Sequence, residues 1–109
     1  MRIHILRFFA IAVAVSSVRA ADPDYKITNI PAPDGVVLEV GGMDWMPDGR
    51  LMMCTRRGEI WAFQPEKVEW KQFASGLHEP LGLVAGKDNS EIYVLQRAEL
   101  TRITDTDKD

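Results

Sequence analysis

Apolar segments and turn-forming residues alternate at short, regular intervals from residue 41 onward. The strongest turn signal is Pro47-Asp48-Gly49, and others lie at Arg57-Gly58 and Lys87-Asp88-Asn89. Such residues favour turns because Gly tolerates a positive φ and because Asp and Asn hydrogen-bond their own backbone. No segment between turns is long enough or periodic enough for a helix, so an all-β fold is predicted. The expected strands cover residues 50–55, 59–63, 68–73, 91–95 and 100–103, with shorter apolar segments at 43–46 and 80–85.

Residues 21–40 are rich in Asp and Pro and predict an extended leader with an edge strand. One short strand is possible around residues 25–30. A second, β-branched strand is expected over residues 36–40, closed by Gly41 and Gly42.

An internal repeat links the two halves of this β pattern. A shift of 40 residues without a gap superimposes Gly42–Phe63 on Gly82–Ile103. Apolar positions match as well, for example Met52 with Ile92, and a period near 40 built from short strands is typical of a propeller blade. The identical pairs are Gly42 and Gly82, Asp48 and Asp88, Arg57 and Arg97, and Glu59 and Glu99.

The strand at residues 92–95 is apolar at consecutive positions, which indicates a strand covered on both faces, as when sheets stack. The sequence therefore predicts a partial β-propeller of about two four-stranded blades. The first blade is expected over 41–79 and a second, incomplete blade over 80–109. Closure needs at least about four blades, so further blades are expected from missing sequence or from other copies.

The first twenty residues have the layout of a secretory signal peptide. Basic residues at the start are followed by an apolar run at 8–15, and Val18 and Ala20 provide a small-residue cleavage site. The alternative is a buried N-terminal helix. The signal predicts export to the periplasm or the extracellular space, and no later segment is apolar for long enough to span a membrane.

Charge and cysteine content narrow the possible partners. The formal net charge is −3, and removal of residues 1–20 takes away Arg2, Arg7 and Arg19 but no acidic residue. An acidic chain without a basic stripe is a poor ligand for nucleic acid. Cys54 is the single cysteine and lies in an apolar run, which predicts a small core residue and excludes an internal disulfide.

The segment from Met43 to Trp61, with its Pro47-Asp48-Gly49 turn, apolar strand and Thr55-Arg56-Arg57-Gly58, resembles the first blade of the glucose/sorbosone dehydrogenase family. Residues 76–107 are similar to an exported, propeller-bearing branch of membrane-bound dehydrogenases.

The resemblance implies a six-bladed propeller that holds pyrroloquinoline quinone and calcium in its central funnel, with a sugar or polyol as substrate. A His base would take the hydroxyl proton while hydride passes to the quinone. The family places that His in later blades, and a haem domain often follows, so this chain by itself is expected to be inactive. The alternative is a non-catalytic propeller that binds carbohydrate or a protein partner.

His78 is the only histidine after residue 20 and the one candidate for a base near neutral pH. It is expected on a loop that enters the second blade. The competing interpretation is that His78 hydrogen-bonds the backbone of that loop.

Arg56, Arg57, Gln96 and Arg97 are expected on corresponding hairpin loops and are candidates for binding an anionic ligand or a quinone carboxylate. The repeated Arg57 and Arg97 could instead pair with a carboxylate on their own blade, such as Glu59 or Glu99. Arg56 is not repeated, which favours a functional role for it.

Asp105, Asp107 and Asp109 alternate at the end of the chain as the first oxygen ligands of a calcium loop do. Lys108 interrupts the pattern. The other possibility is a solvated acidic tail.

Overall fold

The computed structural model describes residues 24–107, so the signal peptide expected over residues 1–20 lies outside the described range. Within that range the protein is all-β, as predicted, and no helix is long and apolar enough to cross a bilayer. The strands are β1 (Val40–Trp45), β2 (Leu51–Thr55), β3 (Ile60–Gln64), β4 (Glu69–Ala74), β5 (Gly82–Ala85), β6 (Glu91–Gln96) and β7 (Glu99–Thr104).

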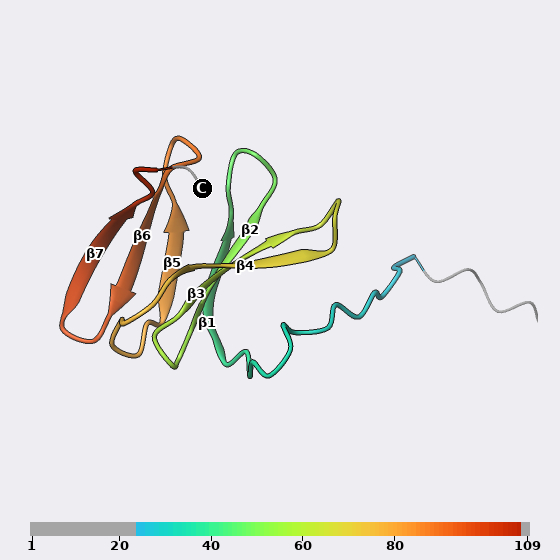
Figure 1. Cartoon of the computed structure of the whole chain (residues 1–109), viewed down its shortest axis with the longest axis horizontal. Helices are drawn as coiled ribbons and strands as arrows, with labels where there is room; N and C mark the ends of the chain where they lie inside the picture. The colour runs from blue at the N-terminus through green and yellow to red at the C-terminus, as the bar shows by residue number, and fades with distance from the viewer. Residues whose placement is uncertain (1–23, 108–109) are drawn as a thin grey trace, which may run out of the picture.

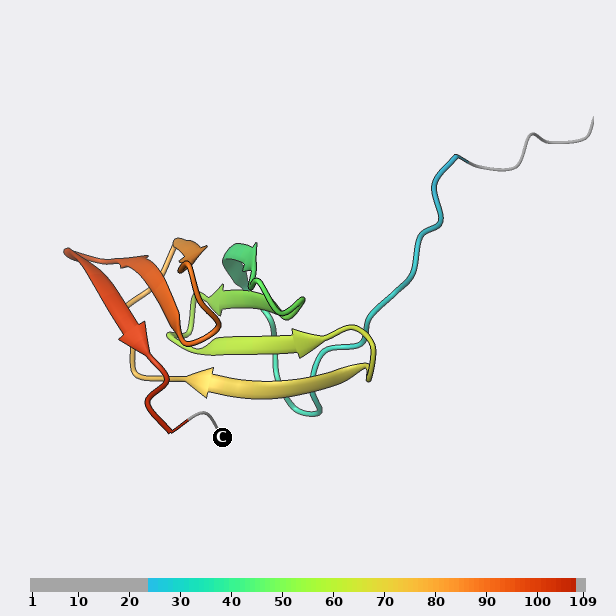
Figure 2. The same ribbon diagram turned by 90° about the horizontal axis from the view of Figure 1, so that it is seen from above.

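The strands form two separate antiparallel sheets that lie side by side (Figures 1 and 2). The first sheet has the order β1-β2-β3-β4 and the second the order β5-β6-β7. Each sheet follows the chain order, so every neighbouring pair is joined by a short connection.

The turns that begin β2 and β6 are built in the same way. Asp48 Oδ1 accepts a hydrogen bond from the backbone N–H of Arg50 at 3.1 Å, and Asp88 Oδ1 accepts one from Ser90 N–H at 2.9 Å. Gly49 completes the first turn with φ 90°. The repeated aspartates therefore fix the two turns by bonding the backbone two residues ahead.

A 40-residue shift places β1, β2 and β3 on β5, β6 and β7, but the register of the middle strand differs. Met43 lies opposite Met53, whereas Leu83 lies opposite Val94. Counted between paired residues, Leu83 to Val94 is one residue longer than Met43 to Met53, and Val94 to Thr101 is one residue shorter than Met53 to Trp61. The structural counterpart of Met52 is therefore Tyr93, and the ungapped match of Met52 with Ile92 was wrong.

The two sheets share one apolar core between their facing surfaces. Alternate residues of each strand point into it because successive strand side chains point to opposite faces. Ile92 and Val94 of β6 are fully buried there, while Leu95 lies on the far side of the second sheet and is exposed. The other buried members of this core are Met46, Met52, Cys54, Ile60, Ala62 and Leu83.

Two glycines at the start of β1 allow the sheets to meet closely. A Cβ atom on Gly42 would lie 2.8 Å from Leu83 N and 2.9 Å from Gly82 Cα, and one on Gly41 would overlap the carbonyl oxygen of Pro80. Beside them, Asp44 Oδ2 accepts a hydrogen bond from the backbone N–H of Ala85 at 2.9 Å. Backbone therefore packs on backbone where β1 meets β5.

The leader differs from expectation. Residues 24–39 contain no strand, so the predicted strands at 25–30 and 36–39 were wrong, and β1 begins at Val40 and continues through both glycines. Pro31 and Pro33 lack the N–H that a sheet ladder needs, and Val36 N–H donates to Pro33 O in a turn that contains Gly35. Gly41 and Gly42 therefore do not end a strand, contrary to the prediction. They lie within β1, where the absence of side chains allows the second sheet to pack closely.

Substitution of Gly42 tests the close contact between the sheets. Gly42→Ala should lower the free energy of unfolding by about 1–3 kcal/mol, because the new methyl group overlaps backbone that cannot move aside. Its repeat counterpart Gly82 is the matched control, since a Cβ there meets only Leu95 Cβ at 3.5 Å. Urea unfolding followed by tryptophan fluorescence should show Gly82→Ala close to the parent protein; equal losses for both variants would contradict this packing.

Cys54 is fully buried, which confirms the predicted core role, and its Sγ lies 3.7 Å from the carbonyl oxygen of Pro80. Burial raises the pKa of the Cys54 thiol. Above about pH 8.5 the unfolded thiol therefore ionises before the folded one, and the free energy of unfolding should fall as pH rises.

The slope of unfolding free energy against pH, measured from pH 8 to 10 by urea titration, should be shallower in Cys54→Ala than in the parent. The smaller side chain of Cys54→Ala lowers the free energy of unfolding equally at every pH, so this loss does not affect the slope. Identical slopes would contradict a buried thiol that resists ionisation.

Candidate functional site

Two hairpin turns and one connecting segment lie together at one end of both sheets, the lower end in Figure 1. They are the β2–β3 turn at residues 56–59, the segment at 76–79 that leads to β5, and the β6–β7 turn at 97–98; we call them the hairpin edge. Leu77 N–H donates to Gly58 O at 3.1 Å, and Arg97 N–H donates to His78 O at 2.9 Å. The segment at 76–79 is therefore bonded to both turns.

All five of the candidate base and anion-binding residues lie at or beside this edge, and three of them share one depression. His78, Gln96 and Arg97 line a shallow depression of about 370 Å³, together with Glu99. Gln96 Oε1 accepts a hydrogen bond from the backbone N–H of His78 at 2.6 Å, and Gln96 Nε2 donates to Glu99 Oε1 at 2.8 Å. His78 is thus held in place through its backbone, and both interpretations of its side chain stay predictions.

The repeated arginines pair with carboxylates other than Glu59 and Glu99, the partners considered from the sequence. Arg97 Nη2 lies 2.9 Å from Glu79 Oε2, and Arg57 Nε lies 3.9 Å from Glu39 Oε2. Each glutamate stands just before the first strand of its sheet. Both pairs are largely exposed, and such pairs contribute at most about 1 kcal/mol each, so their main effect is to neutralise the arginines.

The expected alternative partners of the arginines are engaged elsewhere. Glu59 Oε2 accepts a hydrogen bond from Trp61 Nε1 at 2.9 Å, and Glu99 Oε1 accepts bonds from Gln96 and Thr101. A signal for the true partners was present, because Glu39 and Glu79 are also identical residues 40 positions apart. They lie just before the start of the repeat window and were missed for that reason.

Arg56 differs from the repeated arginines. Its backbone N–H donates to Glu39 O at 2.8 Å, but within residues 24–107 its guanidinium forms no ion pair. The side chain is exposed at the hairpin edge. Among the predicted anion-binding residues, Arg56 therefore has the charge most available to a ligand.

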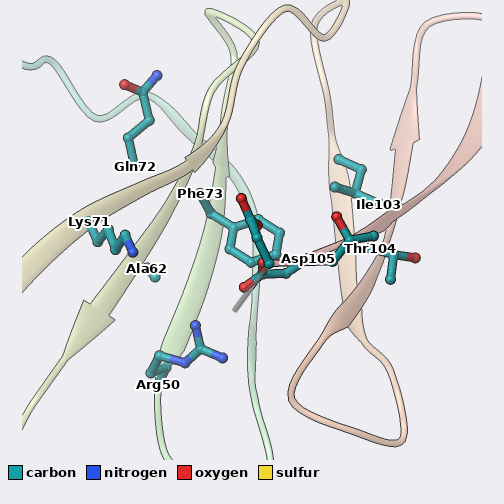
Figure 3. Close-up of a pocket in the computed structure, with 10 residues that line it drawn as sticks. Arg50, Ala62, Lys71, Gln72, Phe73, Ile103, Thr104 and Asp105 are labelled. Carbon is teal, nitrogen blue, oxygen red and sulfur yellow. The ribbon is translucent and has the colours of Figure 1, made fainter. Parts of the chain in front are cut away.

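The candidate metal ligands lie at the opposite end of the sheets. Asp105 and Asp107 line a cavity of about 290 Å³ between β4 and the end of β7, which Figure 3 shows in close-up. Arg50 and Lys71 line the same cavity. Arg50 is already held by Asp48 through an ion pair of 2.8 Å.

Two cations beside the carboxylates oppose the binding of a further cation at this cavity. No cluster of three or more acidic, His or Cys ligands occurs within residues 24–107, and Asp109 lies outside that range. A calcium loop formed by Asp105, Asp107 and Asp109 therefore stays a prediction.

Comparison of the chain with protein-family models, curated proteins and solved structures finds no significant match. The function must therefore be argued from the fold and the two ends of the sheets.

The turn that carries Arg97 offers a test of its backbone conformation. Ala98 has φ 74°, a left-handed conformation that is unfavourable for a residue with a side chain, and its counterpart in the first hairpin is Gly58 with φ 89°. Ala98→Gly should raise the free energy of unfolding by about 0.5–1 kcal/mol. This is the strain relieved in the folded turn less the larger entropy that glycine loses on folding.

Gly58→Ala is the matched comparison, and it should be strongly destabilising because its Cβ would overlap the backbone of Leu77. Both variants can be measured by urea unfolding. A loss of stability in Ala98→Gly would contradict the strained turn.

Proposed function

We propose that the two sheets are adjacent blades of an exported β-propeller, and that the assembled propeller is a quinone-dependent dehydrogenase of the glucose/sorbosone type. The observation that carries the architecture is the repeat of strands, aspartate turns and Arg–Glu pairs at a spacing of 40 residues. The chemistry rests on the resemblance of residues 43–61 and 76–107 to that family. Export rests on the signal-like sequence of residues 1–20.

In this proposal the hairpin edge faces the ligand. Loops held on a rigid sheet scaffold are where ligand contacts concentrate. Arg56, whose guanidinium forms no ion pair within residues 24–107, is offered to an anionic ligand such as a quinone carboxylate, and Gln96 adds an amide at the neighbouring turn. Bound quinone would accept hydride from the sugar; this chain would contribute binding and orientation.

The described residues do not fit the whole cofactor set, because residues 24–107 hold no group of calcium ligands. Glu79, the carboxylate next to His78, is paired with Arg97 rather than with the imidazole. We therefore assign no proton transfer to His78 and propose that the isolated two-sheet chain is inactive.

One observation favours the alternative of a non-catalytic propeller that binds carbohydrate or a protein. Glu39 and Glu79 neutralise Arg57 and Arg97, so the hairpin edge is less basic than a site built for a polyanionic cofactor. A neutral ligand suits this balance of charge.

Titration with pyrroloquinoline quinone and calcium separates the two functions. Quenching of tryptophan fluorescence in the mature chain should report quinone binding, and Arg56→Ala should weaken it about fivefold, the loss expected for one exposed charge contact of about 1 kcal/mol. Lys87→Ala is the control, because this cation lies in the exposed β5–β6 loop at the opposite end of the sheets.

The completed propeller, reconstituted with quinone and calcium, should reduce a dye when aldoses are added. Quinone uptake without turnover would leave only the binding role, and no uptake at all would contradict the dehydrogenase.

A further inference from the structure

The outermost surface of the second sheet carries an uncovered apolar patch. We call it the back face: the side of β5–β7 turned away from the first sheet. Val84, Leu95 and Leu100 on this face are between 56% and 68% exposed. Leu95 lies opposite Leu100 in the ladder, and Val84 lies opposite Tyr93, so these side chains form one continuous patch. Contiguous exposed apolar patches mark interaction surfaces.

The repeat identifies what kind of surface the back face is. Gly82 and Val84 stand where the first sheet has Gly42 and Asp44, and Leu100 stands where it has Ile60. Those counterparts lie on the inner face of the first sheet, which the second sheet covers. The back face is therefore the repeat counterpart of the inner face of the first sheet, and that inner face is covered by another sheet.

The chain also contains a surface that could cover the back face of another copy. We call it the front face: the side of the first sheet turned away from the second. Met43 and Trp45 on this face are 55% and 56% exposed. They are the counterparts of Leu83 and Ala85, the residues by which β5 packs against the first sheet.

The leader covers another part of the front face, near β3 and β4. Trp70 Nε1 donates a hydrogen bond to Pro31 O at 2.8 Å, so the leader lies over this part of the sheet, and Phe63 is buried against Trp70. The largely exposed apolar residues of the front face, Met43 and Trp45, therefore lie on β1, the strand that would meet another back face.

We propose that the mature chain associates head to tail, with the front face of one copy packed on the back face of a second copy. The proposal rests on the blade stacking proposed above and names the partner of that surface. Contact between two different faces is heterologous, so it can close into a ring or continue as a chain. Leu81 stands at the repeat position of Gly41, so the contact is centred on Val84, Leu95 and Leu100.

A back-to-back dimer is the competing arrangement. It would bring Arg102 of both copies into one interface, because Arg102 lies opposite Tyr93 and shares the back face. Glu91 shares that face beside Tyr93, so the face variants below, rather than charge, distinguish the two arrangements.

Sedimentation velocity of the mature chain and of two face variants tests the arrangement. The parent chain should associate as its concentration rises. Trp45→Glu removes the front face and Leu95→Glu the back face, so each variant alone should weaken association at least tenfold. An equimolar mixture of the two retains one intact interface and should form a heterodimer that grows no further.

Val68→Glu is the control, because Val68 is an exposed apolar residue in the β3–β4 turn outside both faces, and it should associate like the parent. Circular dichroism must show each variant folded; Met43→Glu and Val84→Glu provide a second pair if one of the first is not.

A parent chain that stays monomeric at all concentrations would overturn the proposal. So would a Trp45→Glu variant that still dimerises, which indicates back-to-back contact, or a mixture that fails to associate. Association without quinone uptake would contradict the proposed dehydrogenase function but would support the proposed interface. The two proposals can therefore be tested separately.

Discussion

The rest of the structure depends on the contact in which the backbone of β1 lies against the backbone of β5. Gly41 and Gly42 have no side chains, and any Cβ at either position would collide with Pro80, Gly82 or Leu83. Because the sheets approach so closely at this strand, Met52, Cys54 and Ile60 can meet Leu83, Ile92 and Val94 in one buried apolar core. A chain of this size has little apolar surface to bury, and the contact lets two small sheets share what neither can bury alone.

The same constraint places the candidate site. The sheets are copies of one pattern, so their hairpins emerge at the same end and bring equivalent arginines beside equivalent glutamates. Aspartate turns gather at the other end, where Asp48 N–H also donates to Asn89 Oδ1 and so joins the two turns. The repeated arginines at the hairpin edge are thus paired with glutamates. Arg56 is not repeated, and within residues 24–107 its charge is the one available to a ligand there. Repetition also leaves two apolar faces, one at each end of the stack.

Much of this architecture could be predicted from sequence, because turn residues and consecutive apolar residues determine where short strands begin and end. The errors arose where tertiary contact outweighs the local pattern. Gly41 and Gly42 indicated a strand end, yet they lie within β1, since their lack of side chains serves packing between sheets. The match of Met52 with Ile92 failed because the two connections around β6 differ in length by compensating single residues. The partners of Arg57 and Arg97 depend on how the chain enters each sheet, which local spacing does not encode.

Nuclear Overhauser spectroscopy of the isotope-labelled mature chain tests the central contact most directly. A cross-peak is expected between the Hα protons of Gly42 and Gly82, because a Cβ atom on Gly42 would lie 2.9 Å from Gly82 Cα. Methyl cross-peaks from Met52 to Ile92 or Val94 should accompany it. Strand-internal cross-peaks without any signal between residues of β1 and β5 would contradict stacked sheets.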